Sequence, residues 1–173
     1  MGSAQAPLTL YYWHDFQCPD CERFDTQTLP ALVSEYVKTG KLRIVFKDLV
    51  IFGADSQTAA EVSRAVWAVA PSKYYDWQHT VYQRQGSERS GWASRANLLA
   101  ITKSVPGIDV AKVSAHLDRN AASYRASADA DHAEAQRFGI KGTPGFWIDG
   151  QAFSGAQPLS LFRQILNAHL ARP

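Results

Sequence analysis

The sequence contains very little cysteine and methionine, and its charge is almost balanced. Two of its 173 residues are cysteine and one is methionine, which excludes a fold held together by several disulfides. Eighteen Lys and Arg residues stand against sixteen Asp and Glu residues, for a formal net charge of +2. No cluster of basic residues is longer than a pair, so we expect no nucleic-acid partner and no binding to anionic membranes.

Long hydrophobic runs are also absent. No apolar stretch approaches the roughly 18 residues that a membrane span needs. The N-terminus, Met1-Gly2-Ser3-Ala4, lacks the basic and apolar regions of a signal peptide. It resembles a cloning remnant joined to a mature start, so we expect a mature form that lacks its signal or anchor.

The composition is that of an ordinary globular protein, with 46% hydrophobic and 12% aromatic residues. A chain of this length buries roughly 68 to 70% of its unfolded surface. That is enough for one core and a satellite lobe, but too little for two full-sized domains. We expect a monomer.

The N-terminal third predicts a βαβ unit. The apolar runs at residues 8–13 and 41–46 are typical of strands. Between them the pattern predicts one helix that begins near Pro19 and ends at Gly40. Pro30 should kink this helix, because its ring clashes with the carbonyl group four residues earlier.

The next part of the chain has helical patterns and no strand pattern. The helices are expected at residues 58–70, 74–83, 92–104, 110–117 and 123–138. Two strands, 146–149 and 152–154, then flank Asp149-Gly150, a strong hairpin signal, and a last helix follows Pro158. The chain thus divides into residues 7–55, a helical insertion at 56–139, and residues 140–173.

The only cysteine pair is Cys18-Pro19-Asp20-Cys21, where a strand gives way to a helix N-terminus. Free N–H groups and the helix dipole there stabilise negative charge, so Cys18 should favour the reactive thiolate at an exposed position. Cys21, one turn inside, would be the resolving thiol. A zinc site is disfavoured because no other ligands complete it, so we expect no metal and no cofactor. Two merely buried cysteines remain an alternative.

Two motifs carry a family resemblance. Residues 15–21, Asp-Phe-Gln-Cys-Pro-Asp-Cys, and residues 142–150, Gly-Thr-Pro-Gly-Phe-Trp-Ile-Asp-Gly, resemble the signatures of DsbA-like thiol–disulfide oxidoreductases of the thioredoxin superfamily. The resemblance covers most of the chain. It implies an α/β thioredoxin fold with an all-helical insertion between the second strand and the cis-proline strand.

The resemblance also implies that the Thr143–Pro144 bond is cis and lies beside the cysteine pair. Because proline has no N–H, the backbone of Thr143 would be free to pair with an extended substrate peptide as an added strand. An ordinary trans proline that opens a strand is the alternative, and base rates alone favour it.

Four residues near the cysteines are candidates for tuning their redox properties: Pro19, Asp20, His14 and Lys47. The Asp20 carboxylate should oppose a thiolate at Cys18 modestly, because solvent screens it. His14 has the side chain that changes charge near neutral pH, although it could simply line the loop. Lys47 resembles a charged position near the second cysteine, but a solvated lysine at a strand end is the simpler interpretation.

One departure from the family pattern lies six residues before Cys18. Thioredoxin-like enzymes often carry a buried acid there that shuttles protons, whereas this chain has Tyr12. No carboxylate matches that position.

The sequence therefore predicts a protein disulfide oxidase that introduces disulfides into exported proteins through a cycle of Cys18 and Cys21. Its partners would be substrate proteins with cysteine thiols and, as the family implies, a quinone-linked membrane oxidase that recycles it. An extracytoplasmic location, the periplasm or cell envelope, follows, because an oxidant of this type is maintained only in an oxidising compartment. The alternatives are a thioredoxin-like reductase, a glutathione-dependent small-molecule isomerase, and a binding module with a structural disulfide.

Overall fold

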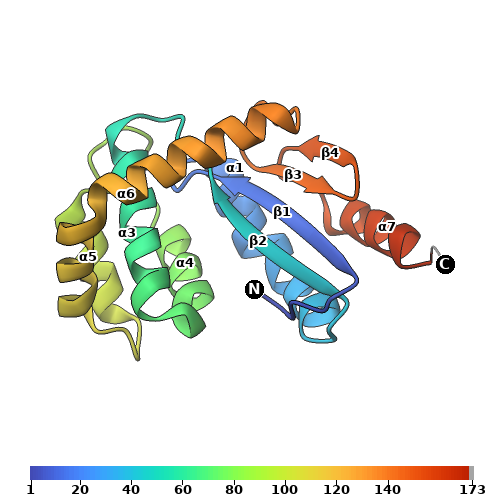
Figure 1. Cartoon of the computed structure of the whole chain (residues 1–173), viewed down its shortest axis with the longest axis horizontal. Coiled ribbons are helices and arrows are strands. Elements are labelled where there is room, and N and C mark those ends of the chain that lie inside the picture. The colour runs from blue at the N-terminus through green and yellow to red at the C-terminus, as the bar shows by residue number, and fades with distance from the viewer. Residues whose placement is uncertain (172–173) are drawn as a thin grey trace.

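A four-stranded mixed sheet of order β2-β1-β3-β4 lies at the centre of the molecule (Figure 1). The computed structural model describes residues 1–171. Strands β1 (Leu8–His14) and β2 (Leu42–Asp48) are parallel, while β3 (Gly145–Ile148) runs antiparallel to β1 and β4 (Gln151–Ser154) antiparallel to β3. The predicted strands are confirmed, within two residues at their ends.

The helical segment after β1 is continuous in path but irregular in hydrogen bonding. It consists of α1 (Pro19–Arg23), a π-helical turn η1 (Phe24–Thr28), α2 (Leu29–Leu32) and a second π-helical turn η2 (Val33–Val37). The N–H of Leu29 bonds to the carbonyl of Phe24, five residues back. The distortion expected at Pro30 therefore takes the form of a π turn, a common way for a helix to accommodate an interruption.

The insertion is entirely helical, as predicted. Its elements are α3 (Ala54–Val69), η3 (Pro71–Lys73), α4 (Tyr74–Gln83), α5 (Arg95–Ser104) and α6 (Val110–Arg137). The prediction of separate helices at 110–117 and 123–138 was wrong, because both belong to the 28-residue α6. The apolar pattern lapses in the middle because α6 leaves one core and enters another: Leu117 packs in the insertion, and Ala135 packs against the sheet.

Helices cover both faces of the sheet. On one face, the segment from α1 to η2 and α7 (Leu159–Leu170) pack on a cluster that includes Leu10, Tyr12 and Phe146. On the other, the C-terminal part of α6 covers Trp13. Figure 1 shows the remaining insertion helices gathered beyond the β2 edge of the sheet, with α6 running back over it.

The hairpin between β3 and β4 turns at the predicted dipeptide. Asp149 has a φ of 45° and Gly150 a φ of 87°, as a two-residue hairpin with positive φ at both positions requires. Gly145, which opens β3, is needed for another reason: a Cβ atom there would lie 2.3 Å from Cγ2 of Ile140. Glycine thus allows the loop before β3 to pack closely.

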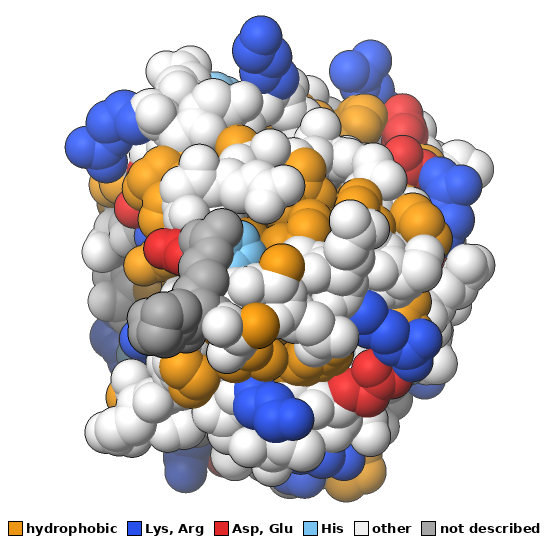
Figure 2. All heavy atoms as spheres, turned by 90° about the vertical axis from the view of Figure 1, so that its right-hand side faces the viewer, with side chains coloured by type: hydrophobic (Ala, Val, Ile, Leu, Met, Phe, Trp, Pro, Cys, Tyr) orange, Lys and Arg blue, Asp and Glu red, His pale blue; other side chains and the backbone are white. Residues whose placement is uncertain are grey.

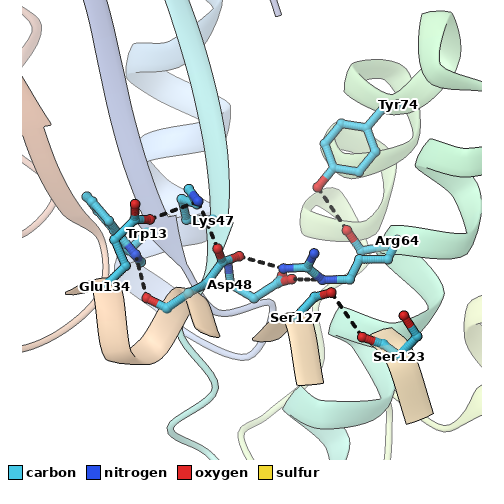
Figure 3. A network of polar contacts seen from close by, with 10 residues as sticks. Trp13, Lys47, Asp48, Arg64, Tyr74, Ser123, Ser127 and Glu134 are labelled. Atoms are coloured by element: carbon cyan, nitrogen blue, oxygen red, sulfur yellow. Dashed lines mark hydrogen bonds and ion pairs between the residues drawn. The ribbon is translucent and has the colours of Figure 1, made fainter. Parts of the chain in front are cut away.

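An ion-pair network ties the insertion to the sheet (Figure 3). Arg64 of α3 contacts Asp48 of β2 at 2.7 Å and Asp131 of α6 at 2.5 Å. Lys47 contacts Asp131 at 2.9 Å and Glu134 at 2.8 Å. Residues of β2, α3 and the distant α6 therefore share one set of buried and half-buried charges.

The face that carries the hairpin and α7 has no large patch of one kind (Figure 2). Hydrophobic side chains lie in small groups between polar ones, and Lys and Arg are scattered around the rim with acidic residues among them. Across residues 1–171, no helix is both long enough and apolar enough to cross a membrane.

Candidate active site

Cys18 occupies the N-cap of α1, directly before Pro19 at the first helical position. Its carbonyl accepts the backbone N–H groups of Cys21 and Glu22, both at 3.1 Å. Proline suits this position because its missing N–H would have had no helical partner. The sulfur of Cys18 therefore lies where unpaired N–H groups favour negative charge.

Both cysteines are reduced and buried. Cys18 is 4% exposed and Cys21 is 0% exposed, so the expectation of an exposed Cys18 was wrong. The reason is that the insertion packs over the helix terminus. Phe16, Cys18 and Cys21 belong to the same apolar cluster as the insertion residues Trp77 and Tyr82, a contact that sequence periodicity does not reveal.

The two thiols differ strongly in acidity. Hydrogen bonding with the Cys21 side chain is the largest effect that lowers the pKa of Cys18 to about 7, followed by the Thr143 hydroxyl and the Cys21 backbone. Burial and the charge of Asp15 act in the opposite direction. Burial raises the pKa of Cys21 well above its ordinary value. Cys18 is thus the more acidic of the two thiols.

The loop before β3 completes the site. The Thr143–Pro144 bond is cis, as the resemblance implied. The Cys18 thiol donates to the Thr143 carbonyl at 3.3 Å, so this loop lies against the dithiol. The Thr143 hydroxyl oxygen is buried and has no hydrogen-bond partner of ordinary geometry among the described residues.

Asp15 shapes the loop that carries the cysteines. Its carboxylate accepts the backbone N–H of Gln17 at 2.9 Å and that of Ile51 at 2.9 Å. This ties the cysteine loop to the segment after β2. Sequence reasoning assigned Asp15 only to a motif, but its charge adds to burial in opposing the lowered pKa of Cys18.

The proposed tuning residues Asp20, His14 and Lys47 differ in exposure, in charge and in the face of the sheet on which they lie. The Asp20 carboxylate is exposed and pairs with Arg23. His14 is 2% exposed, and burial lowers its pKa to about 3, so it is neutral and offers no charge to a thiolate. Lys47 lies on the α6 side of the sheet, because its neighbour Phe46 is the one that contacts Tyr12. The structure therefore does not bring Lys47 to the dithiol.

Two residues around the site were missed by sequence reasoning: Gln85, which comes from the insertion, and Asp25, which lies in η1 of the cysteine helix. Gln85 donates to the carbonyls of Phe16 at 2.8 Å and of Cys18 at 3.1 Å. Asp25 is fully buried and pairs with His79. Its spacing of four residues after Cys21 was a usable signal, since such residues share one helix face.

A sheet of this topology, with a cysteine pair at the first helix and a cis-proline beside it, is a thioredoxin fold, and solved structures of DsbA-like proteins share it. The comparisons with known proteins agree. The chain belongs to the thioredoxin family, whose model matches residues 1–168.

The most similar proteins include disulfide bond formation proteins. The chain is 28% identical over 151 residues to "Probable disulfide bond formation protein D" of Bacillus cereus, covering 87% of this chain and 69% of that one. The crystal structure of oxidised BdbD from Bacillus subtilis has a TM-score of 0.88 at 20% identity and covers 99% of this chain and 92% of that one. The thiol-disulfide exchange protein alpha-DsbA2 of Wolbachia pipientis has a TM-score of 0.83 at 24% identity, over 96% and 84%.

We expect Thr143→Val to raise the pKa of Cys18 by about one to two units. Among the described residues the Thr143 hydroxyl has no hydrogen-bond partner of ordinary geometry, so it is available to the Cys18 thiolate and lowers the pKa of Cys18. A hydrogen bond to a charged group contributes about 1.5 to 3 kcal/mol. Valine has the same shape but no hydroxyl, and it leaves the backbone carbonyl in place. Thiolate absorbance followed against pH measures the shift. Thr143→Ser keeps the hydroxyl and should retain the native value; a similar shift in both variants would contradict the assignment.

Proposed function

We propose that this protein is a protein disulfide oxidase whose redox centre is Cys18 and Cys21. The observation that carries the proposal is the asymmetry of the pair: a thiol with a pKa lowered to about 7 at a helix N-terminus, and a fully buried partner whose pKa is raised. Attack on a disulfide requires a thiolate, and resolution requires a second thiol nearby. Relatives named for disulfide bond formation support oxidation, not reduction, of the substrate.

The proposed reaction has two exchange steps. A substrate thiolate attacks Sγ of Cys18 in the oxidised protein, which forms a mixed disulfide and releases Cys21. A second substrate thiolate then attacks the substrate sulfur of that mixed disulfide, so the substrate gains a disulfide and Cys18 leaves as a thiolate. Two electrons remain on the Cys18–Cys21 dithiol, and an external oxidant must remove them.

Thr143 and Pro144 are proposed to bind the substrate backbone. In the reduced protein the Cys18 thiol donates to the Thr143 carbonyl. A sulfur engaged in a mixed disulfide has no hydrogen to donate, so that carbonyl becomes free to accept an N–H of the substrate. An extended peptide would then pair with the loop as an added strand.

The proposed function is tested by oxidation of a reduced, unfolded protein substrate with glutathione disulfide as the terminal oxidant. The protein should accelerate the appearance of correct disulfides, and the Cys18→Ser variant should have no effect above background. A protein that reduces substrate disulfides but never forms them would contradict the proposal.

A reductase is the second candidate, and one observation favours it. A Cys18 pKa of about 7 is close to that of thioredoxin, about 7, and far from that of DsbA, about 3.5. At pH 7 such a thiol is half ionised, which stabilises the reduced form by only about 0.4 kcal/mol, or about 10 mV. The reduction potential separates the two candidates.

The cellular setting is part of the proposal. We propose an extracytoplasmic monomer, because stable disulfide formation belongs to oxidising compartments. A quinone-linked membrane oxidase would supply the oxidant that the cycle requires. We also propose that the insertion at residues 56–139 is a lobe of the thioredoxin domain, not an independent domain, since it shares a core with the cysteines.

We expect Asp20→His to lower the pKa of Cys18 by less than about one unit, because exposed charge interactions contribute about 0.2 to 1 kcal/mol. The removed carboxylate is exposed and already paired with Arg23. Thiolate absorbance against pH measures the change, with Asp76→His on α4 as the control for an exposed acid elsewhere. A rise in the pKa of Cys18, or a fall of several units, would contradict this account of Asp20.

A further inference from the structure

The backbone carbonyl of Cys18 has more hydrogen-bond donors around it than it has lone pairs. The N–H groups of Cys21 and Glu22 each lie 3.1 Å from this oxygen, and so does the side-chain amide of Gln85. A carbonyl oxygen has two lone pairs, so the three donors cannot all bond to it at full strength. One of the three is therefore available to another acceptor nearby.

The Cys18 sulfur becomes such an acceptor when the thiol ionises. Cys18 is the N-cap of α1, and a capping side chain accepts the N–H of the second or third helical residue. In the reduced protein the thiol makes no capping bond, and its hydrogen is donated to the Thr143 carbonyl at 3.3 Å. The thiolate has lost that hydrogen and can only accept. The third helical residue is Cys21, and hydrogen bonding to its backbone is one of the effects that lower the pKa of Cys18.

Gln85 allows the Cys21 N–H to change partners. Its Nε2 atom donates to the carbonyls of Phe16 at 2.8 Å and of Cys18 at 3.1 Å. Both partners are oxygen acceptors, so only the NH2 group of the amide can serve them, with one hydrogen for each. When the Cys21 N–H turns to the sulfur, Glu22 and Gln85 still occupy both lone pairs of the Cys18 carbonyl. Without Gln85, the same change would leave that carbonyl one donor short.

The C-terminal end of α4 holds Gln85 in place. The backbone N–H of Gln85 donates to the carbonyl of Tyr82, in the last turn of the helix, at 3.0 Å. Gly86 follows, and a Cβ atom there would lie 2.7 Å from Cβ and Cγ of Trp92. Glycine thus lets the chain after Gln85 pack closely against Trp92. The Gln85 side chain is therefore presented to the cysteine loop by a packed turn.

A second glutamine makes the reverse contact, from the cysteine loop to the insertion. Gln17 is 0% exposed, and its Oε1 atom accepts the N–H of Arg89 at 2.6 Å. Its Nε2 atom donates to Oγ of Ser56 at 3.1 Å. The cysteine loop and the loop after α4 therefore hold each other through two side-chain amides. This pairing keeps Gln85 within hydrogen-bond distance of the Cys18 carbonyl.

We propose that Gln85 is a positioning residue that prepares Cys18 for thiol–disulfide exchange: it occupies the Cys18 carbonyl, so that the N–H of Cys21 is free to bind the Cys18 thiolate. Among the described residues, no hydrogen bond joins Gln85 to the sulfur itself. Gln85 acts only through the backbone of the cysteine loop. The insertion thereby contributes to the reactivity of the dithiol as well as to its burial.

The other groups that act on the Cys18 sulfur do so independently of Gln85. The Cys21 thiol and the Thr143 hydroxyl favour ionisation of Cys18, while the charge of Asp15 opposes it. The Asp15 carboxylate accepts backbone N–H groups, including that of Gln17 at 2.9 Å. None of these three side chains is bonded to the Cys18 carbonyl in the part of the chain that the structure describes. The effect of Gln85 can therefore be measured separately from theirs.

The first test replaces Gln85 with methionine in the full chain, which keeps most of the side-chain length and removes both donors. The pKa of Cys18 in the reduced variant should rise. Below the native pKa the fraction of Cys18 present as thiolate should fall about two- to tenfold, the range that one hydrogen bond accounts for. Thiolate absorbance followed against pH measures the change. A native pKa in Gln85→Met would overturn the proposal.

The amide proton of Cys21 gives a spectroscopic readout that a merely structural role of Gln85 would not move. In the native protein its NMR signal should shift downfield as Cys18 ionises, because the N–H then bonds to a thiolate. In Gln85→Met the shift should be smaller, because the N–H stays on the carbonyl. Equal shifts in the two proteins would overturn the proposal, whatever the stability of the variant.

Gln83→Met is the matched control. Gln83 is an exposed glutamine of the same helix, and its Nε2 atom lies 3.1 Å from Nε2 of His79. The variant should keep the native pKa of Cys18 and the native shift of the Cys21 amide signal. Changes as large as those in Gln85→Met would mean that any substitution near the end of α4 disturbs the dithiol, and would overturn the specific role of Gln85.

Two charged variants decide the question if Gln85→Met does not fold. The ammonium group of Gln85→Lys can donate to both carbonyls, so the Cys21 amide signal should still shift as Cys18 ionises. Gln85→Glu has nearly the shape of glutamine but no donor when ionised, so the shift should be lost and the pKa of Cys18 should rise. The same shift in both variants would overturn the proposal.

The inference rests on Cys18 as the attacking thiol of the proposed function but can fail separately from the oxidase. Both readouts follow ionisation of the reduced protein and need no substrate. Native ionisation of Cys18 in Gln85→Met would contradict the positioning role alone. A native protein that cannot form disulfides in a substrate would contradict the oxidase alone.

Discussion

Replacing Cys21 with serine is expected to reduce turnover to background and to leave Cys18 joined to its substrate in a mixed disulfide. The attacking thiol, with its pKa lowered to about 7, survives in this variant. The fully buried resolving thiol is gone, so the reduced variant attacks a substrate disulfide and cannot release the product. Mass spectrometry of trapped species under non-reducing conditions measures the result.

The matched control is Cys18→Ser, which should trap no substrate and be equally inactive. In the native protein, iodoacetamide at mildly acidic pH should modify Cys18 before Cys21, because the less acidic Cys21 is also the more deeply buried. Trapping through Cys21 in the Cys18→Ser variant, or alkylation of Cys21 first, would reverse the assigned roles.

The second large effect is expected for stability. Arg64→Met should lower the free energy of unfolding by about 3 to 5 kcal/mol, because removing one partner of a buried ion pair leaves uncompensated charge. Arg64 pairs with both Asp48 and Asp131, and methionine keeps most of its length. Urea unfolding followed by tryptophan fluorescence measures the loss.

Arg125→Met is the matched control, because it too removes an arginine that joins α3 to α6. Arg125 contacts Glu61 at 2.9 Å, but its side chain is 60% exposed against 25% for Arg64. Exposed pairs contribute about 0 to 1 kcal/mol. Equal losses of unfolding free energy in the two variants would mean that the ion pairs of Arg64 do not hold the insertion against the sheet.

The loss of unfolding free energy caused by Arg64→Met should depend on pH. Burial raises the pKa of Asp48 from 3.8 to about 6, while Arg64 pulls it down. Because the folded state then binds more protons than the unfolded state between about pH 4 and 6, the contribution of Asp48 to stability falls as pH rises through this window. Without Arg64 the pKa of Asp48 in the folded protein rises further. Arg64→Met should therefore lower the free energy of unfolding more at pH 8 than at pH 5.

Patterns of short range allowed most of the fold to be predicted. The alternation in β2, the hairpin signal at Asp149-Gly150 and the periodicity of α4 each depend on residues close together in sequence. The continuity of α6 was missed because apolar periodicity reports burial, and the middle of α6 crosses between two cores. No glycine or proline interrupts residues 110–137, which was the better evidence.

The cysteine pair could be predicted from a sequence motif. Features of the site that depend on tertiary contacts could not be predicted. Cys18 and Cys21 were found from their spacing and from the helix start. The low exposure of Cys18 depends on α4 and Gln85, far along the chain. The positions of His14 and Lys47 on opposite faces of the sheet follow from the alternation of strands once Tyr12 is known to pack on Phe24 of the cysteine helix.

The reduction potential of the Cys18–Cys21 disulfide, from equilibration with glutathione at pH 7, tests the central claim most directly. Thioredoxin has a potential of about −270 mV and DsbA of about −120 mV, and about 30 mV is a tenfold change in the equilibrium constant. An oxidase with Asp20 between its cysteines should have a potential between these values, clearly more oxidising than that of thioredoxin. A value at or below about −270 mV would contradict the oxidase and identify a reductase.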